Sequence, residues 1–397
     1  MRATVPIYSA CRKMIKPSWT LTDFFGEGVA FNPVPCFEET GWLFPERAAC
    51  DVLTANQLTF ADAAPVICHT SVSTPRVLRM LNDAGLPSAE RVERYETRSD
   101  YHEVLARLQQ EGWRIATTHA QADGVIPADV LWIDASTQRW LNDKGNLDAL
   151  VPKGGAPQRH RLSAAEFQAL IDVEFPVVFK VCSPLTSGAG FGVRVCSNAD
   201  ELRAAQQQLA TAPSVVMEEW LDIEKSWCIQ FFVAPDGAVH SLGAAEQVTG
   251  ADGSWHGNWL ASPAPALAVD IGAGAARAGA ERGYRGPMGL DVALCRDGRL
   301  CALDANFRVN GSTALLVYRE SLAERGVSVI RSRGWSFDGG FDRMAMVVRA
   351  AVDRAHFLPT SAWDPQTGVP RVTGFVLGTS RAEVLGRIGM LEHAGLR

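Results

Sequence analysis

The chain has 397 residues, of which 47% are hydrophobic, so it is long enough for two or three domains with separate cores. Its formal net charge of −6 argues against a general nucleic-acid surface or an anionic-membrane surface, because both need a basic excess. No apolar run approaches the length of a membrane span, and the first twenty residues lack the continuous apolar segment of a secretory signal.

The nine cysteines are an odd number and contain no C-x-x-C spacing. Several, including Cys68, Cys182 and Cys301, lie within apolar, strand-like runs. This usage is typical of buried free thiols in a reducing compartment, and not of a disulfide scaffold or a zinc site. We therefore expect a cytoplasmic protein that binds neither nucleic acid nor membrane.

The first 135 residues divide into two textures. Residues 1–60 are rich in Pro and aromatic residues and predict an irregular N-terminal arm. In residues 61–135, short β-rich runs alternate with helical patterns, which predicts a small parallel α/β domain.

A glycine-rich loop between two strands marks the next region, residues 136–217. Lys180 ends an apolar strand, and the loop that follows carries Ser187, Gly188, Gly190 and Gly192. Glycines let backbone N–H groups approach a polyphosphate, and an ammonium adds a point charge. The loop does not have the Walker pattern, because the Lys precedes the glycines. A flexible hairpin turn explains the same residues without any ligand.

Paired acids end a strand at the start of residues 218–330. Glu218 and Glu219 are followed by an aromatic–aliphatic step that includes Leu221, and then by Glu224. Such a segment offers backbone groups to an adenine edge and a carboxylate to ribose hydroxyls. Ordinary solvated acids at a strand end are the alternative.

The most informative segment is residues 289–312, in which Asp297-Gly298 joins two apolar, β-rich runs and so predicts a hairpin. Asp291 lies on the first run, while Asp304 and Asn306 lie two residues apart on the second and therefore point to the same face. Oxygen ligands of this kind suit Mg²⁺, and Arg308 just beyond them suits an anion. A solvated face with ordinary turn residues remains the alternative. Residues 331–397 predict a smaller C-terminal α/β tail.

Taken in order, these segments resemble the ATP-grasp family. The resemblance rests on the NDK-containing helix near Lys144, on Lys180 with its glycine loop, on the acidic hinge at Glu218, and on the Asp304–Arg308 signature. It covers roughly residues 141–325. It implies an α/β architecture in which two lobes clasp ATP, preceded by the small parallel α/β domain: residues 136–217 would form the first lobe and 218–330 the second lobe with the metal site.

The resemblance also implies residue roles. Lys144 and Lys180 would contact the α- and β-phosphates, and the loop from Ser187 to Gly192 would close over the triphosphate. The hinge would hold the nucleoside, with adenine at Glu218 and at the backbone of Glu219 and Leu221, and ribose at Glu224. Asp291, Asp304 and Asn306 would bind one or two Mg²⁺, and Arg308, with Lys180, would act in catalysis by steadying the reacting group.

Three features depart from the family pattern. The spacing between the hinge and Glu224 is short, which disfavours contact of Glu224 with the ribose. The usual Glu of its E-x-N-x-R signature is Asp304, one methylene shorter, which changes the chelation geometry. The segment 245–263 offers only His256 as a basic residue for phosphate contact, so we expect Glu246 and Gln247 to be structural or next to adenine.

The function that these features imply is an ATP-dependent carboxylate–amine ligase. A substrate carboxylate would attack the γ-phosphate, and an amine would capture the acyl phosphate with release of ADP and phosphate. The tail resembles that of the pheganomycin-type peptide ligases, which favours amino-acid or peptide substrates. The alternatives are a kinase or an acid–thiol ligase on the same scaffold, and a nucleotide-binding module without catalysis. A homodimer is the expected assembly. We expect the substrate to be selected by the N-terminal arm, by residues 255–259 and by residues 310–313.

Overall fold

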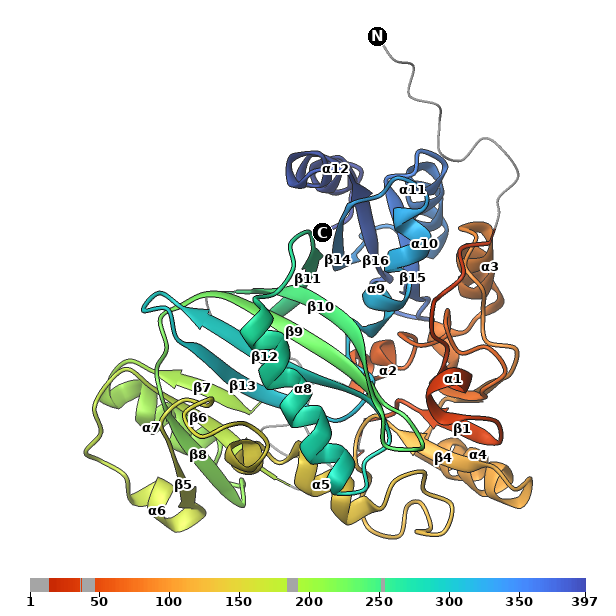
Figure 1. Cartoon of the computed structure of the whole chain (residues 1–397). Helices are drawn as coiled ribbons and strands as arrows, with labels where there is room; N and C mark the ends of the chain where they lie inside the picture. The colour runs from red at the N-terminus through yellow and green to blue at the C-terminus, as the bar shows by residue number, and fades with distance from the viewer. Residues whose placement is uncertain (1–13, 36, 38–46, 184–191, 251–253) are drawn as a thin grey trace.

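The computed structural model describes residues 14–35, 37, 47–183, 192–250 and 254–397. These residues form three sheets (Figure 1). Among the described helices, none has the length and apolar character that crossing a membrane requires. The described cysteines are all buried and unbridged, as the sequence predicts.

The N-terminal domain is a parallel sheet of four strands in the order β3-β2-β1-β4. Its strands are β1 (Val29–Asn32), β2 (Val66–His69), β3 (Val92–Tyr95) and β4 (Arg114–Thr117). The helices beside them are α1 (Leu21–Phe25), α2 (Arg47–Leu53), η1 (Thr70–Val72), α3 (Pro75–Asp83) and α4 (Arg98–Gln110). The strands and helices that the sequence predicts for residues 61–135 are confirmed.

The expectation of an irregular arm over residues 1–60 is wrong for the part that the structure describes. Strand β1 lies between β2 and β4, inside the sheet. It has only four residues, and all of them are buried. A short strand covered on both faces shows no polar–apolar alternation, so the pattern that identifies half-buried strands is absent.

The first lobe contains an antiparallel sheet in the order β5-β8-β6-β7. Its strands are β5 (Arg159–Ser163), β6 (Val177–Cys182), β7 (Val193–Cys196) and β8 (Ser214–Glu219). Helices α6 (Ala164–Ala169) and α7 (Ala199–Gln208) belong to the same lobe, and their buried side chains share one apolar core with the sheet. Helix α5 (Ala135–Asn142) and the 3₁₀ helix η2 (Lys144–Ala149) connect this lobe to the N-terminal domain.

The second lobe and the C-terminal tail share one eight-stranded antiparallel sheet, in the order β13-β12-β9-β10-β11-β14-β16-β15. Its strands are β9 (Ile223–Val233), β10 (Val239–Thr249), β11 (Trp255–Leu260), β12 (Gly286–Cys295), β13 (Leu300–Asn306), β14 (Val329–Ser336), β15 (Phe357–Trp363) and β16 (Arg371–Gly378). The helices are α8 (Ala266–Glu281), α9 (Thr313–Val317), α10 (Arg319–Ala323), α11 (Phe341–Asp353) and α12 (Arg381–His393).

Two of the expected boundaries fall inside strands of these sheets. The boundary between residues 217 and 218 cuts β8, and the boundary between 330 and 331 cuts β14. The tail is therefore continuous with the second lobe in one sheet, through the pairing of β11 with β14.

Helix α8 packs across the second-lobe sheet (Figure 1). Its Ala- and Gly-rich sequence permits a close approach: a Cβ added at Gly279 would lie 2.1 Å from Cε1 of Phe307. Phe307 is fully buried, and it connects Asn306 to Arg308. The small residues of α8 therefore set the position of the chain at the end of β13.

Candidate active site

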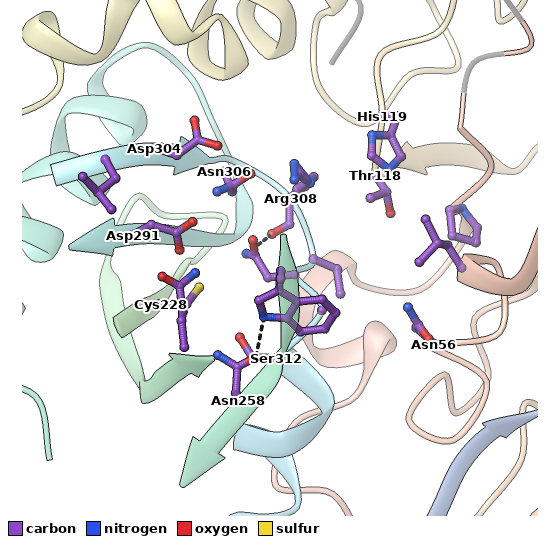
Figure 2. Close-up of a pocket in the computed structure, with 18 of the residues that line it drawn as sticks. Asn56, Thr118, His119, Cys228, Asn258, Asp291, Asp304, Asn306, Arg308 and Ser312 are labelled. Carbon is purple, nitrogen blue, oxygen red and sulfur yellow. Dashed lines mark hydrogen bonds between the residues drawn. The ribbon is translucent and has the colours of Figure 1, made fainter. Parts of the chain in front are cut away.

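A cavity of about 300 Å³ lies where the N-terminal domain, the first lobe and the second lobe meet. Six of the residues that the sequence analysis singled out line it together: Lys144, Lys180, Asp291, Asp304, Asn306 and Arg308. They come from η2, β6, β12, β13 and the segment after β13. In Figure 2 Asp291, Asp304, Asn306 and Arg308 follow one another along one side of the cavity.

The hairpin of β12 and β13 forms as the sequence predicts, and we refer to it as the acidic hairpin because it carries Asp291 and Asp304. Gly298 has φ +86° in the turn, and Asp291 on β12 is the direct cross-strand partner of Asp304 on β13. Two carboxylates in this register repel each other. Burial, together with the charge of Asp304, raises the pKa of Asp291 to about 6.

The donor set of this hairpin fits a magnesium ion. Oδ1 of Asp291 is buried and has no hydrogen-bond partner among the described residues. The other donors are a second carboxylate and the amide of Asn306, oxygen ligands of the kind that Mg²⁺ prefers. Over the described residues, no group of three or more His, Cys, Asp or Glu side chains gathers in a metal-binding arrangement, so the set depends on the amide as its third donor.

Lys144 lies across from this hairpin and pairs with it. Its Nζ lies 2.5 Å from Oδ2 of Asp304. Burial alone would raise the pKa of Asp304, but Lys144, and secondarily Lys180, outweigh it and bring that pKa below its ordinary value. Asp304 is therefore ionised in this structure.

Lys180 is held in a buried network on the first lobe. Its Nζ lies 2.6 Å from Oε2 of Glu218 and donates to the carbonyl oxygen of Leu303 at 2.8 Å. Arg159 on β5 lies 3.0 Å from the other oxygen of Glu218. The side chain of Glu218 is 2% exposed, so its carboxylate neutralises two cations in a nearly dry environment.

This network departs from the expected role of Glu218. The carboxylate is engaged by Lys180 and Arg159, and Glu218 does not line the cavity. The reason is the register of the first-lobe sheet, in which β8 lies between β5 and β6 and so brings Glu218 next to a cation from each neighbour.

The other predicted nucleotide contacts lie outside the cavity lining. Glu219 forms a bidentate ion pair with Arg299, at 3.0 and 3.2 Å. Leu221 is buried in a small apolar cluster with Cys295 and Cys301, against which Leu303 packs, while Glu224 is exposed on β9. Leu303 itself lines the cavity and so connects this cluster to it.

The glycine loop falls mainly outside the described residues. Ser187, Gly188 and Gly190 are among those that the structure does not describe, whereas Gly192 is described with φ +76°. The carbonyl oxygen of Gly192 accepts a hydrogen bond from the amide of Val181 at 2.9 Å. Gly192 therefore closes the β6–β7 pairing after Lys180.

Arg308 lines the cavity on the same side as Asn306, two residues further along the chain. Burial lowers the pKa of its guanidinium, and Asp304 and Asp291 oppose this effect by favouring the charge. Among the described residues, no hydrogen bond to its guanidinium is formed within the chain. A half-buried cation of this kind is suited to bind an anionic group of a substrate.

The sequence analysis expected residues 1–60 to contribute to substrate selection but named no individual residue there, and it missed Thr118 and His119. Asn56, Gln57, Thr118 and His119 line the cavity opposite the hairpin, and Figure 2 shows Thr118 and His119 facing Arg308 across it. Thr118 and His119 directly follow β4. Because ligands of parallel sheets bind at the carboxyl ends of strands, that position is the signal that would have found them.

Cys182 has no catalytic arrangement. It is buried, and burial followed by the negative charge of Asp143 raises its pKa to about 11. A thiol with such a pKa is not an activated nucleophile at neutral pH. The sequence-based interpretation of Cys182 as a packed strand residue agrees with this geometry.

Two family models match separate parts of the chain. Residues 20–139 match the N-terminal domain of L-aspartate--L-methionine ligase, and residues 157–306 match its ATP-grasp domain. The second match ends at Asn306 and contains Lys180 and the acidic hairpin.

Solved structures share the fold. An L-amino acid ligase from Bacillus licheniformis has 14% identity and a TM-score of 0.53, covering 84% of this chain and 97% of that chain. A biotin carboxylase–β-γ-ATP complex from Campylobacter jejuni has 12% identity and a TM-score of 0.55, covering 93% and 92%. An N5-carboxyaminoimidazole synthase from Aspergillus clavatus, in complex with ADP, has 13% identity and a TM-score of 0.55, covering 92% and 98%.

At these identities the solved structures establish the fold alone, whereas the two family models cover both the N-terminal and the ATP-binding parts. The chain therefore belongs to the ATP-grasp L-aspartate--L-methionine ligase family and is an ATP-dependent enzyme that forms a C–N bond between a carboxylate and an amine.

Proposed function

We propose that this enzyme joins L-aspartate to L-methionine through an aspartyl phosphate, with Mg²⁺ as its metal cofactor. The description of the family supports the two substrates. The observation that carries the chemistry is the convergence of two lysines, two carboxylates, an amide and an arginine on one cavity. A binding module without catalysis has no need for Arg308 beside the acidic hairpin.

In the first half-reaction, a carboxylate oxygen of aspartate attacks the γ-phosphorus of ATP, and the bond to the β,γ-bridging oxygen breaks. The transferred group is anionic, so catalysis requires fixed positive charge around it. One cation at 4 Å contributes roughly 4 kcal/mol at an intermediate effective dielectric, before desolvation costs. Lys144, Lys180 and Arg308 therefore act together.

The two lysines are already oriented for this task. Glu218 and the Leu303 carbonyl hold Lys180, and Asp304 holds Lys144, each at hydrogen-bond distance. Both ammonium groups have thus lost most of their water before ATP binds. Preorganised charges of this kind cost little reorganisation at the moment of reaction.

Asp291, Asp304 and Asn306 would hold the magnesium, whose charge would neutralise phosphate oxygens when it is bound. The buried oxygen of Asp291, which has no partner among the described residues, supports this assignment. The shorter side chain of Asp304 does not remove it from the cavity.

The nucleoside would lie at the hinge side of the cavity. Leu303 lines the cavity and packs against the cluster of Leu221, which provides an apolar surface for adenine. The backbone of Glu219 and Leu221 would bind the adenine edge, and Glu224 would bind the ribose. Glu218 instead positions Lys180.

In the second half-reaction, the amine of methionine attacks the acyl carbon, the bond from that carbon to the phosphate oxygen breaks, and inorganic phosphate leaves. Water competes with the amine for the same carbon. The N-terminal domain covers the cavity opposite Arg308 with Thr118 and His119, which are 8% and 5% exposed, and this cover limits access of water.

The test is product analysis with the purified enzyme, ATP, Mg²⁺ and both amino acids. We expect ADP, phosphate and an Asp–Met dipeptide, identified by mass spectrometry, to form in equal amounts. Little ADP should form when either amino acid is omitted. Full ADP release without an amine, or a phosphorylated product that accumulates, would favour a kinase. AMP and pyrophosphate would contradict the acyl-phosphate scheme.

A further inference from the structure

The walls of the cavity differ in charge. The ionisable Lys, Asp and Arg side chains lie on the wall formed by η2, β6, β12, β13 and the segment directly after β13. They are Lys144, Lys180, Asp291, Asp304 and Arg308. The wall formed by β10, β11 and the segment 309–312 has no charged side chain among its described lining residues. Its polar and aromatic members are Gln247, Thr249, Trp255, Asn258, Asn310 and Ser312. We refer to this second surface as the neutral wall.

Trp255 is fixed within the neutral wall. Its Nε1 donates a hydrogen bond to Oδ1 of Asn258 at 3.1 Å, and Asn258 is itself 1% exposed. The far edge of the indole lies against Gly311, where an added Cβ would be 3.1 Å from Cη2. Trp255 nevertheless remains 36% exposed. A large apolar ring is thus held rigidly at the cavity with part of its surface uncovered.

The polar groups beside this ring are largely used within the protein. Oγ of Ser312 accepts a hydrogen bond from the buried Gln230 at 2.6 Å, and Nδ2 of Asn310 donates to the carbonyl oxygen of Arg308 at 2.8 Å. In Figure 2 Asn258 and Ser312 lie together on one side of the cavity, away from Thr118 and His119. The neutral wall therefore offers a ligand an aromatic surface and few ionic contacts.

From this geometry we infer that the neutral wall holds the side chain of the amine substrate, and that Trp255 selects an apolar or thioether side chain. The inference rests on the proposed function and adds the location of one of its substrates. Aspartate carries two carboxylates and is directed to Arg308, the cation of the charged wall that lacks a partner within the described chain. An uncharged side chain incurs no charge-desolvation penalty when it moves from water to the surface of an indole. A thioether also makes a favourable contact with the aromatic ring.

The two substrates are close enough to react in this arrangement. Gly311 is three residues from Arg308, so their Cα atoms are separated by at most about 11 Å of chain. An amino acid whose side chain lies on Trp255 can therefore place its amine near the group bound at Arg308.

The experiment compares the acceptors methionine, norleucine, glycine and hydroxylamine in the wild type and in Trp255→Ala, Trp255→Phe and Gly311→Ala. Hydroxylamine has no side chain and captures an acyl phosphate directly, so it reports on aspartate activation alone. Met346→Ala, which removes a 65%-exposed apolar side chain outside the cavity, is the matched control. Thermal melting of each variant reports on folding.

For Trp255→Ala we expect the KM for methionine to rise about tenfold, which corresponds to about 1.4 kcal/mol of contact energy. The KM values for aspartate and ATP, and the rate of hydroxamate formation, should stay within about twofold of the wild type. Trp255→Phe should keep most of the preference for methionine over glycine. Gly311→Ala should reduce it, because the added methyl group pushes the ring towards the cavity.

Equal losses of turnover with methionine, glycine and hydroxylamine in Trp255→Ala would overturn the inference. A rise in the KM for aspartate, with the KM for methionine unchanged, would also overturn it. A wild type that forms aspartyl hydroxamate but does not prefer methionine over glycine would also overturn it, while leaving the activation step intact. A wild type that forms no hydroxamate would contradict the proposed function itself.

Discussion

Asp291 lies directly opposite Asp304 in the antiparallel pairing of β12 with β13, and only Asp304 has a lysine against it. The raised pKa of Asp291, about 6 against an ordinary 3.8, means that its ionised form opposes folding at pH 7. The ionised Asp291 therefore lowers the free energy of unfolding at pH 7, and a cation bound between the two carboxylates would offset this loss.

Replacing this carboxylate should separate stability from function. We expect Asp291→Asn to raise the unfolding free energy of the metal-free enzyme by about 2 kcal/mol at pH 7, since a shift of two pKa units corresponds to about 2.7 kcal/mol. The same variant should lose ligase turnover by about 100-fold or more. Thermal melting without divalent ions, beside ADP release with both amino acids, measures the two effects. A variant that is both less stable and fully active would refute the role given to Asp291.

Asn306 should control the metal requirement. Removing the amide in Asn306→Ala takes away the third donor, so we expect the Mg²⁺ concentration for half-maximal turnover to rise about tenfold or more. Chelation by EDTA should abolish turnover in the wild type, and added Mg²⁺ should restore it. Unchanged Mg²⁺ dependence in Asn306→Ala, with ATP still bound, would remove this residue from the metal site.

Two neighbouring glutamates provide a matched pair for the positioning of Lys180. Glu218 is buried between Lys180 and Arg159, whereas Glu219 pairs with the half-exposed Arg299. Removing the charge of a buried ion pair leaves its cations uncompensated, so Glu218→Gln should cost about 3 kcal/mol in the free energy of unfolding and raise the KM for ATP. Glu219→Gln should cost less than about 1 kcal/mol. Denaturant titration and ATP kinetics of the two variants make the comparison. Equal changes in the free energy of unfolding and in the KM for ATP would show that burial of the Lys180 network contributes neither to stability nor to ATP binding.

Helix α8 contains a second matched pair. Gly279→Ala would place a Cβ 2.1 Å from the ring of Phe307, whereas Gly274 in the same helix has open space around it. We expect Gly279→Ala to destabilise the protein by about 1–3 kcal/mol and to slow turnover, because Phe307 joins Asn306 to Arg308. Gly274→Ala should stabilise the protein by up to about 1 kcal/mol. Chemical denaturation with parallel activity assays tests both, and an active, stable Gly279→Ala enzyme would contradict the coupling between α8 and the site.

The parts of this site that the sequence predicts are those encoded locally. The β12–β13 hairpin follows from Asp297-Gly298 and from alternation, and the same alternation brings Asp304 and Asn306 to one face. Lys180 is recognisable from its apolar strand, although the strand does not end there as expected: β6 continues to Cys182. The roles given to these residues stay predictions, but their convergence on one cavity is confirmed.

The parts that the sequence does not predict depend on distant contacts. The partners of Glu218 come from β5 and β6, and nothing in the local sequence specifies that β8 lies between them. Strand β14 was missed because Arg331 interrupts its apolar pattern. That arginine is 5% exposed, and its guanidinium donates to the carbonyl oxygens of His256 and Ser332. Burial, reinforced by Arg333, lowers its pKa to about 10.

The central claim is that a substrate carboxylate is phosphorylated in the cavity between the acidic hairpin and Arg308. Aspartate labelled with ¹⁸O in its carboxylates tests it directly, by mass spectrometry of the phosphate released during dipeptide formation. The account predicts one ¹⁸O atom in each phosphate, carried over when the acyl phosphate is cleaved at carbon. Unlabelled phosphate formed alongside the dipeptide would contradict it.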